Sequence, residues 1–214
     1  LIEIRNEYGF QFLHRGTLKF RIDTMQYKSK IFILIFTLSI FTTMCTSQDE
    51  LIETPTPTNE PLTATLTDIE GEVIVIKSNG DKVTVISDLE LMIGDQVFTM
   101  HDGKAKLVYS SGTIVRISPI SAFSLVEQYI NEDSKPFAKL KLELGQLWII
   151  LVGGSLDVDS NSGVASVRGS YLQVTYDPET NEMRITCLEG RCLLGNDAGS
   201  VKIEAGQSAI VIGS

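Results

Sequence analysis

Residues 163–192, GVASVRGSYLQVTYDPETNEMRITCLEGRC, decide the fold, because two alternating runs here flank a turn-rich loop. Alternation of apolar and polar side chains is typical of a strand with one buried face. The stretch ends with Cys187 and Cys192, which bracket Leu-Glu-Gly-Arg. If the two strands pair across that turn, the cysteines lie at the cross-strand distance of a disulfide. The sequence therefore predicts a short hairpin closed by a disulfide, with two buried thiols as the alternative.

Short runs of the same kind recur from residue 64 to residue 212, and each is bounded by turn residues. Asn79-Gly80 separates two of these runs, and this pair is a strong hairpin signal because both residues tolerate positive φ. Residues 101–104 and 110–113 are further glycine-containing turn segments between two such runs. We therefore expect three tight hairpins in this half of the domain.

Gly145 is expected to form a turn between the runs 137–144 and 146–152. Roughly fifteen short strands with hardly any helical period predict a single all-β domain built as a sandwich, a roll or a β-solenoid-like stack. We expect a signal or anchor helix and a disordered linker to precede this domain.

The charge is strongly biased along the chain. The sequence has 18 Lys+Arg and 27 Asp+Glu, a formal net charge of −9. Six basic and three acidic residues fall in the first 45 positions, so the remainder holds 12 and 24, a net charge of −12. Such a field repels phosphate backbones and disfavours anionic lipid headgroups, and no basic stripe with interleaved aromatic residues appears. We expect no nucleic-acid partner.

The first methionine, Met25, precedes two lysines and the apolar run 31–44, which is typical of a secretory signal and shorter than a comfortable membrane span. We take residues 25–45 as a signal peptide or signal anchor and residues 1–24 as an upstream extension or a cytoplasmic tail. Cys45 follows the apolar run at the place of an acylated lipoprotein cysteine, with an ordinary cleaved signal as the alternative.

Residues 46–63, TSQDELIETPTPTNEPLT, are rich in Thr, Pro and acidic side chains. This composition favours an extended, disordered linker. We expect it to hold the β-domain, residues 64–214, away from a membrane to which the N-terminal segment is attached.

Six segments, in order and at familiar spacing, resemble the FecR domain family. They are GDQVFT (94–99), GKAKLVYSSGTIVRISPISAFSL (103–125), LKLELGQLW (140–148), SGVASVRGSYLQV (162–174), LEG (188–190) and IEAGQSA (203–209). The motif positions carried over from this resemblance are Gly94, Asp95, Gly112, Gly145, Arg168, Gly169, Gly190 and Gly206. FecR-like proteins of the iron-transport type hold such a β-domain outside the cytoplasmic membrane, where it relays the occupancy of an outer-membrane receptor to a sigma factor.

The resemblance implies the fold and an extracytoplasmic sensing or scaffolding role in the cell envelope, either membrane-anchored or secreted. It does not imply sigma-factor regulation, because no cytoplasmic segment of useful length precedes the apolar run. Our first hypothesis is a non-enzymatic domain that binds a protein or polysaccharide partner at the cell surface. A structural or self-assembling surface component is the alternative, and a transmembrane regulator of a sigma factor is a third hypothesis.

No group of residues in the sequence has the pattern of a catalytic, metal or cofactor site, so we expect no enzyme activity, metal or cofactor. DVDSNSG (157–163) is a poor match to a calcium loop, because its glycine falls one place late and Arg168 occupies the twelfth position. His101 is expected in a solvated turn, and two thiols with one histidine are too few for zinc.

Two further residues are assigned structural roles. Trp148 lies in a continuously apolar run and is expected in the core. Arg168 and Gly169 lie between two strands, and we expect the glycine to permit a bulge or a tight crossing. A ligand-reading role for Arg168 is the alternative.

Overall fold

The strands of this protein arise where apolar side chains alternate with polar ones, as the sequence predicts. The computed structural model describes residues 2–5, 61–169 and 171–213, and every regular element in them is a β-strand. The all-β prediction is confirmed for these residues. The predicted signal segment 25–45, Cys45 and most of the predicted linker lie outside the described residues.

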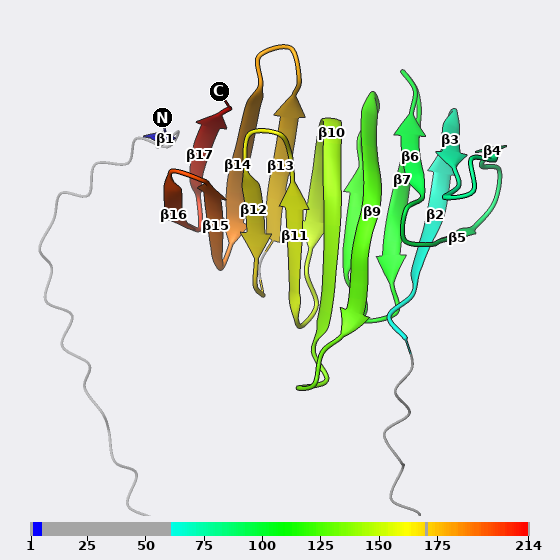
Figure 1. Cartoon of the computed structure of the whole chain (residues 1–214), viewed down its shortest axis with the longest axis horizontal. Helices are drawn as coiled ribbons and strands as arrows, with labels where there is room; N and C mark the ends of the chain where they lie inside the picture. Colours follow the sequence, from blue (N-terminus) through cyan, green and yellow to red (C-terminus); the bar gives the residue numbers. More distant parts are fainter. Residues whose placement is uncertain (1, 6–60, 170, 214) are drawn as a thin grey trace, which may run out of the picture. The chain divides into compact units, whose positions relative to one another are not determined.

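The described residues contain seventeen strands, which form two sheets that face each other across one core (Figure 1). The strands of sheet 1, in spatial order, are β1 (Ile2–Arg5), β17 (Gln207–Ile212), β14 (Glu182–Glu189), β13 (Tyr171–Asp177), the second half of β10 (Pro136–Ile150), β8 (Ile114–Ile117), β7 (Lys104–Tyr109), β2 (Ala64–Glu70) and β5 (Leu89–Leu91).

The strands of sheet 2, in spatial order, are β4 (Lys82–Thr84), β3 (Val73–Ile76), β6 (Gln96–Thr99), β9 (Ser121–Ile130), the first half of β10, β11 (Ser155–Asp159), β12 (Val164–Val167), β15 (Arg191–Asn196) and β16 (Gly199–Glu204). All neighbours pair antiparallel except β10 and β11, which are parallel. The three-residue strand β5 was not predicted, because its side chains are too few to show a period.

The long strand β10 belongs to both sheets. Phe137 pairs with β9 and β11 in sheet 2, whereas Ile150 pairs with β8 and β13 in sheet 1. The strand changes sheets at Gly145, whose φ is +96° and whose missing Cβ would lie 2.3 Å from the Ser121 hydroxyl oxygen. The prediction of a turn at Gly145 is wrong, since the glycine bends one continuous strand instead of ending it.

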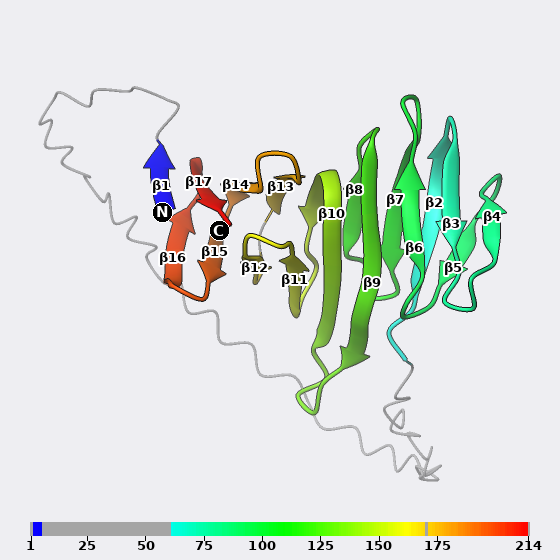
Figure 2. The same ribbon diagram turned by 45° about the horizontal axis from the view of Figure 1, so that its top comes forward.

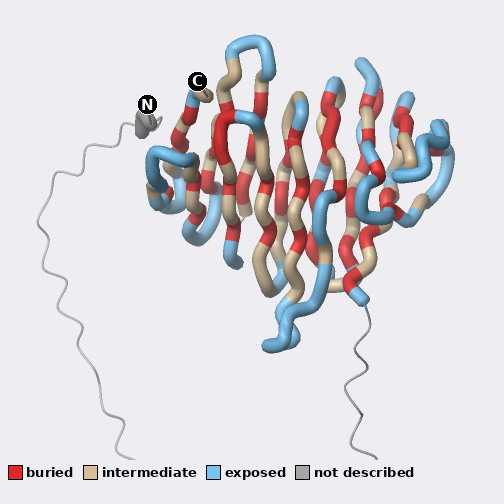
Figure 3. Tube along the Cα trace, viewed as in Figure 1, coloured by how far each residue is buried: buried red, intermediate tan, exposed pale blue. Residues whose placement is uncertain are grey.

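The core lies between the sheets, and most of the strands from β2 onward contribute alternate residues to it (Figure 3). In β7 the buried side chains are Ala105, Leu107 and Tyr109, and in β8 they are Val115 and Ile117. The opposite phase of each strand faces outward. Each sheet therefore presents one outer face to solvent, and these two faces lie on opposite sides of the sandwich.

Turns of similar composition either close a hairpin within one sheet or carry the chain from one sheet to the other (Figure 2). Residues 78–81 and 110–113 close the hairpins β3–β4 and β7–β8, as predicted. Residues 101–104 instead carry the chain from β6 in sheet 2 to β7 in sheet 1, so the hairpin predicted there is wrong. Gly103 has no room for a Cβ, which would lie 2.2 Å from the Glu72 carbonyl oxygen.

The N-terminal side of the domain includes part of the predicted linker. Leu62 is buried in the core, and the Thr63 amide donates a hydrogen bond to the Ser110 hydroxyl at 3.1 Å. Packing therefore starts at least two residues before β2. Within the described residues, no helix has the length and apolar character that a membrane span requires.

Candidate functional site

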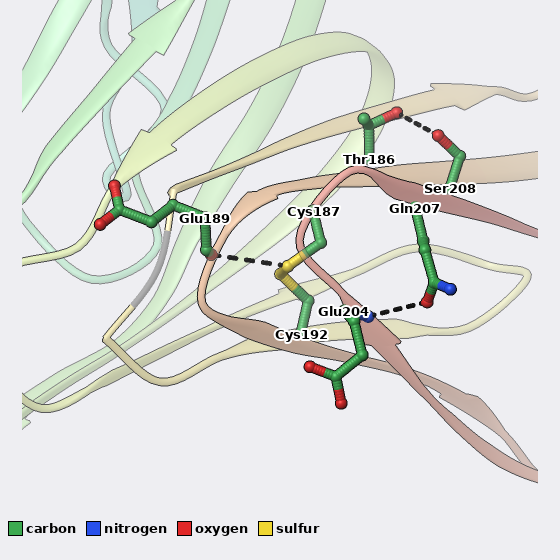
Figure 4. The surroundings of a disulfide bond; sticks show 7 residues. All are labelled: Thr186, Cys187, Glu189, Cys192, Glu204, Gln207 and Ser208. Atoms are coloured by element: carbon green, nitrogen blue, oxygen red, sulfur yellow. Dashed lines mark hydrogen bonds between the residues drawn. A yellow bond between two sulfur atoms is a disulfide. The ribbon is translucent and has the colours of Figure 1, made fainter. Parts of the chain in front are cut away.

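The cysteine pair joins the two sheets (Figure 4). Cys187 lies in β14 of sheet 1 and Cys192 in β15 of sheet 2, and they form a disulfide with a Cα–Cα distance of 5.9 Å. The two strands are not paired with each other: Cys187 pairs with Leu172 and Gln207, whereas Cys192 pairs with Val167 and Ile203. The predicted hairpin is therefore wrong. The disulfide closes a crossing between sheets, with Gly190 at φ +73° in the turn.

Hydrogen bonds hold the adjoining crossing from β16 to β17 beside the disulfide. The Glu204 amide donates to the side-chain oxygen of Gln207 at 3.0 Å, and the hydroxyls of Thr186 and Ser208 lie 2.9 Å apart (Figure 4). The chain also crosses from sheet 2 to sheet 1 after β12, through Gly169 at φ +69°, which agrees with the predicted tight crossing. Three crossings are thus gathered at one end of these strands.

Asp95 is a buried carboxylate that ties two segments together. Its side chain is 1% exposed and accepts hydrogen bonds from the Ser78 amide at 2.8 Å, the Met92 amide at 2.9 Å and the Lys77 ammonium at 2.9 Å. These donors come from the β3–β4 hairpin and from the crossing between β5 and β6. Lys77 also donates to the Glu90 carbonyl oxygen. The carboxylate therefore replaces backbone partners that these turns cannot provide.

The electrostatic state of Asp95 follows from these contacts. Burial alone would raise the pKa of its carboxyl group, but hydrogen bonds from Met92, Lys77 and Ser78, with the charge of Lys77, outweigh burial and hold the pKa below its usual value. Asp95 is therefore a stable anion in the folded domain. Its geometry indicates a structural clamp, since its buried carboxylate accepts hydrogen bonds from two separate turns.

Trp148 lies on the outer face of sheet 1. Its neighbours Leu147 and Ile149 are fully buried, whereas Trp148 and Ile150 are only half-buried, so the prediction of a core tryptophan is wrong. Trp148 lies beside Tyr171 with ring centroids 6.2 Å apart. Period-2 alternation, applied to this run as to the others, would have predicted that Trp148 faces outward.

An apolar row adjoins these rings on the outer face of sheet 1. Ile150 pairs with Ile114 on one side and with Tyr171 on the other, and Ile114 pairs with Val108. All these outward side chains are half-buried. Five large apolar or aromatic side chains from four strands thus form one surface, which we call the Trp148 surface: Val108, Ile114, Trp148, Ile150 and Tyr171.

Polar residues border the Trp148 surface. Trp148 pairs with Arg116 on one side and with Gln173 on the other, and Arg116 pairs with Lys106. A groove of about 330 Å³ lies beside them and is lined in part by Lys106 and Arg116. Lys106 forms an ion pair with Asp68 across the β2–β7 pair. The surface therefore has an apolar centre and a charged margin.

Among the described residues, no group of three or more His, Cys, Asp or Glu side chains could hold a metal ion. The predicted solvated position of His101 agrees with its exposed place in the β6–β7 turn. In the DVDSNSG segment, Asp159 pairs with Lys139 at 2.7 Å, and Ser160 bonds the Gly163 carbonyl oxygen across the β11–β12 turn. The hydrogen bond from Lys139 to Asp159 raises the pKa of Lys139. These contacts are those of a structural turn.

The remaining predicted positions have backbone roles. Gly94 precedes Asp95 at φ +93°, Gly112 lies in the β7–β8 hairpin at φ +89° and Gly206 lies in the β16–β17 turn at φ +81°. Arg168 is exposed at the end of β12. The structure brings Cys187, Cys192, Arg168 and Gly190 to one end of the sandwich, but it places Asp95 in the other half of the strand order.

Comparison with known proteins gives one family. Residues 95–192 match the model of the family described as FecR protein. This part of the chain is similar to the FecR family. The FecR segment begins at the clamp residue Asp95 and ends at the disulfide residue Cys192, so it contains Trp148 and all of β10. The resemblance expected from the sequence motifs is confirmed.

Two solved structures of a "putative anti-sigma factor" from Parabacteroides distasonis ATCC 8503 share 13% sequence identity with this chain, with a TM-score of 0.47. Each match covers 54% of this chain and 53% of the other, so the chain matches about half the length of those proteins. Among curated protein sequences, none matches this one.

Proposed function

We propose that this protein is a non-enzymatic, extracytoplasmic FecR-like domain that binds a protein partner through the Trp148 surface and takes part in signalling at the cell envelope. The observation that carries the proposal is the Trp148–Tyr171 pair, which is half-exposed on the outer face of a rigid sheet. The similarity of residues 95–192 to the FecR family supports a regulatory role.

The composition of the Trp148 surface favours a protein as its occupant. Protein interfaces have an aromatic and apolar centre, a polar margin and frequent Trp, Tyr and Arg anchors. Trp148 and Tyr171 provide the aromatic anchors, and Arg116 and Gln173 lie next to Trp148 in the register of the sheet. Because the ring positions are fixed by paired strands, little side-chain freedom is lost on binding.

Three observations support a location outside the cytoplasm. The Cys187–Cys192 disulfide suits an oxidising compartment, because cytoplasmic thiols are kept reduced. The sequence 25–45 has the pattern of a signal peptide or signal anchor. The following Thr- and Pro-rich stretch suits a tether between a membrane and the domain.

The test is affinity capture from solubilised cell envelope with wild-type protein, Trp148→Ala and the control Thr175→Ala. Thr175 is a half-buried outward position on β13, away from the apolar row. We expect the same discrete partner with wild type and the control, and loss of that partner with Trp148→Ala. Undiminished capture by Trp148→Ala would overturn the proposal, and ladders of self-association would favour the structural alternative.

A second variant separates binding from folding. Leu147→Ala removes a fully buried side chain next to Trp148 and is expected to cost about 2–5 kcal/mol of unfolding free energy. Trp148→Ala is expected to cost less than Leu147→Ala, because its side chain is half-buried. Mass spectrometry of the mature N-terminus tests the anchor: a start at Cys45 or later would exclude a cytoplasmic regulatory segment.

A further inference from the structure

The outer edge of β17 differs from the other sheet edges among the described residues. Strands at an edge expose unpaired backbone groups, which proteins protect by keeping the strand short or by placing charged side chains on it. The edge strands β4 and β5 have three residues each, and the edge strand β16 carries Lys202 and Glu204. In contrast, β17 has six residues, QSAIVI, with no charge and no proline. Its edge therefore lacks this protection and depends on a cover.

In the structure the cover is β1, which comes from the distant N-terminal part of the chain (Figure 2). The two strands are antiparallel, with Ile2 opposite Val211 and Arg5 opposite Ser208. The sequence of β1, Ile-Glu-Ile-Arg, alternates apolar and charged residues. Its two isoleucines are in register with Val211 and Ala209, whose own side chains are buried in the core. The edge therefore accepts an extended segment with an apolar residue at every second position.

The pairing of β17 with β14 identifies the backbone groups that face this edge. The Gly213 amide donates to the Asn181 carbonyl oxygen at 2.9 Å, in the same register as the β14–β17 pair. Backbone groups of successive residues in an antiparallel strand point to opposite sides, so the odd-numbered residues of β17 face β14. The even-numbered residues Ser208 and Ile210 therefore direct their N–H and C=O groups toward the outer edge.

The proposed export of the domain separates β1 from this edge. The predicted signal segment, residues 25–45, lies between β1 and the domain in the sequence. Cleavage of a signal peptide removes β1, whereas an uncleaved anchor holds β1 and the domain on opposite sides of the membrane. In both cases the edge of β17 is open in the exported domain.

We propose that the outer edge of β17 is a strand-addition site, where an extended segment of a partner protein pairs antiparallel with residues 208–211. In this mode of binding, main-chain hydrogen bonds give affinity and alternate side chains give specificity. The segment has the chemistry of β1, with apolar residues opposite Ala209 and Val211 and charged residues at the positions between. A second copy of this chain would offer QSAIVI, which lacks those charges. This inference rests on the proposed export but not on the Trp148 surface, from which β14 separates the edge.

The probe is a synthetic peptide with the sequence of residues 1–8, LIEIRNEY, and the protein is the full chain lacking residues 2–5. The edge of β17 in this chain is vacant whether or not the signal is cleaved. We expect saturable binding by fluorescence anisotropy, with NMR shifts at the amides of Ser208 and Ile210. The same binding by Trp148→Ala would show that the site is separate from the Trp148 surface.

A matched pair of variants tests the edge itself. Ile210→Pro removes the N–H that faces the edge and leaves the groups that face β14, so it should weaken peptide binding at least about tenfold. Ile210→Ala loses the same side chain but keeps the N–H, and it should bind more tightly than Ile210→Pro. In the peptide, Glu3→Pro should likewise weaken binding more than Glu3→Ala, because Glu3 is opposite Ile210.

Three results would overturn the proposal. The first is no binding with peptide up to about 1 mM, the range of weak sites. The second is equal affinity of Ile210→Pro and Ile210→Ala, with thermal unfolding showing that both are folded. The third is a dimer of the chain lacking residues 2–5 that Ile210→Pro abolishes, since a second copy would then occupy the edge.

The export is measured separately, by mass spectrometry of the N-terminus after cell fractionation. A soluble, uncleaved chain that retains residues 2–5 would refute the export, and with it the open edge, even where the peptide binds the chain lacking them. A cleaved or anchored chain whose edge does not bind the peptide would refute the strand-addition site alone.

Discussion

Replacement of Asp95 by asparagine tests whether one buried carboxylate holds the β3–β4 hairpin and the β5–β6 crossing together. Three donors converge on this side chain: the amides of Ser78 and Met92 and the ammonium group of Lys77, all at 2.8–2.9 Å. Asparagine has the same shape but only one acceptor oxygen. Its amide group would face a donor, leaving a buried N–H or the Lys77 charge without its partner.

The expected loss can be worked from these contacts. A buried donor left unsatisfied costs about 1–3 kcal/mol, and hydrogen bonds to charged groups contribute about 1.5–3 kcal/mol each. Lys77 is 23% exposed and regains some hydration, which limits the penalty. We expect Asp95→Asn to lower the free energy of unfolding by about 3 kcal/mol, and the melting temperature by roughly 10 °C for a domain of this size.

Urea unfolding at neutral pH measures the change, with Asp88→Asn as the control. Asp88 is exposed in the loop between β4 and β5, so its substitution should change stability by less than about 0.5 kcal/mol. A double-mutant cycle with Lys77→Met isolates the ion pair from the two backbone hydrogen bonds. If Asp95→Asn lost no more stability than the control, the assignment of Asp95 as a clamp would be wrong.

The pH dependence gives an independent check on the same residue. The folded-state pKa of Asp95 lies below the unfolded-state value of about 3.9. Its contribution to stability is therefore present above about pH 4 and is lost as the pH falls through the lower, folded-state pKa. The stability difference between wild type and Asp95→Asn should shrink in this acid range. A difference that stays constant down to the acid transition would contradict the lowered pKa.

Two further predictions concern the crossings between sheets. Gly145→Ala should cost at least about 3 kcal/mol, because the new Cβ would lie 2.3 Å from the Ser121 hydroxyl oxygen at a φ of +96°. The control is Gly80→Ala, because Gly80 has φ +92° but open space around the position of a Cβ, and it should cost about 1 kcal/mol. Urea unfolding measures the stability of both variants. Equal losses would show that the close approach at Gly145 is unimportant. Removing the disulfide by Cys187→Ala with Cys192→Ala should cost about 2 kcal/mol by the chain-entropy model for a short loop, plus the loss of buried sulfur atoms. Reducing agent should lower the melting temperature of wild type but leave the double variant unchanged, and free thiols in the unreduced, folded wild type would refute the bond.

The sequence predicts the strands better than it predicts the sheets. The period-2 pattern shows which side chains of residues 171–177 face the core, and the structure buries Leu172, Val174 and Tyr176. The pattern does not show which sheet a strand joins, because strands of both sheets face the same core and have the same alternation of apolar and polar residues. The turn Leu-Glu-Gly-Arg has the composition of a hairpin loop, yet its strands belong to different sheets.

The site residues were harder to predict for a related reason. Asp95 was found only through a family resemblance, since its donors Ser78 and Met92 come from turns whose approach depends on the tertiary fold. The cysteines were found by spacing, which also suits a crossing because a disulfide needs only proximity. The neighbours of Arg168 depend on the pairing of β12 with β15, a long-range register that composition does not indicate.

The long strand β10 explains how one chain can present two different surfaces. Its first half displays Lys139 and Lys141 on the outer face of sheet 2, and after the bend at Gly145 its second half displays Trp148 and Ile150 on the outer face of sheet 1. A shared, packed core separates the two faces, and the disulfide holds the sheets together at the crossing between β14 and β15. Sites that are far apart and share no partner residues act additively. Any coupling between the two outer faces would therefore have to pass through β10 or through the disulfide.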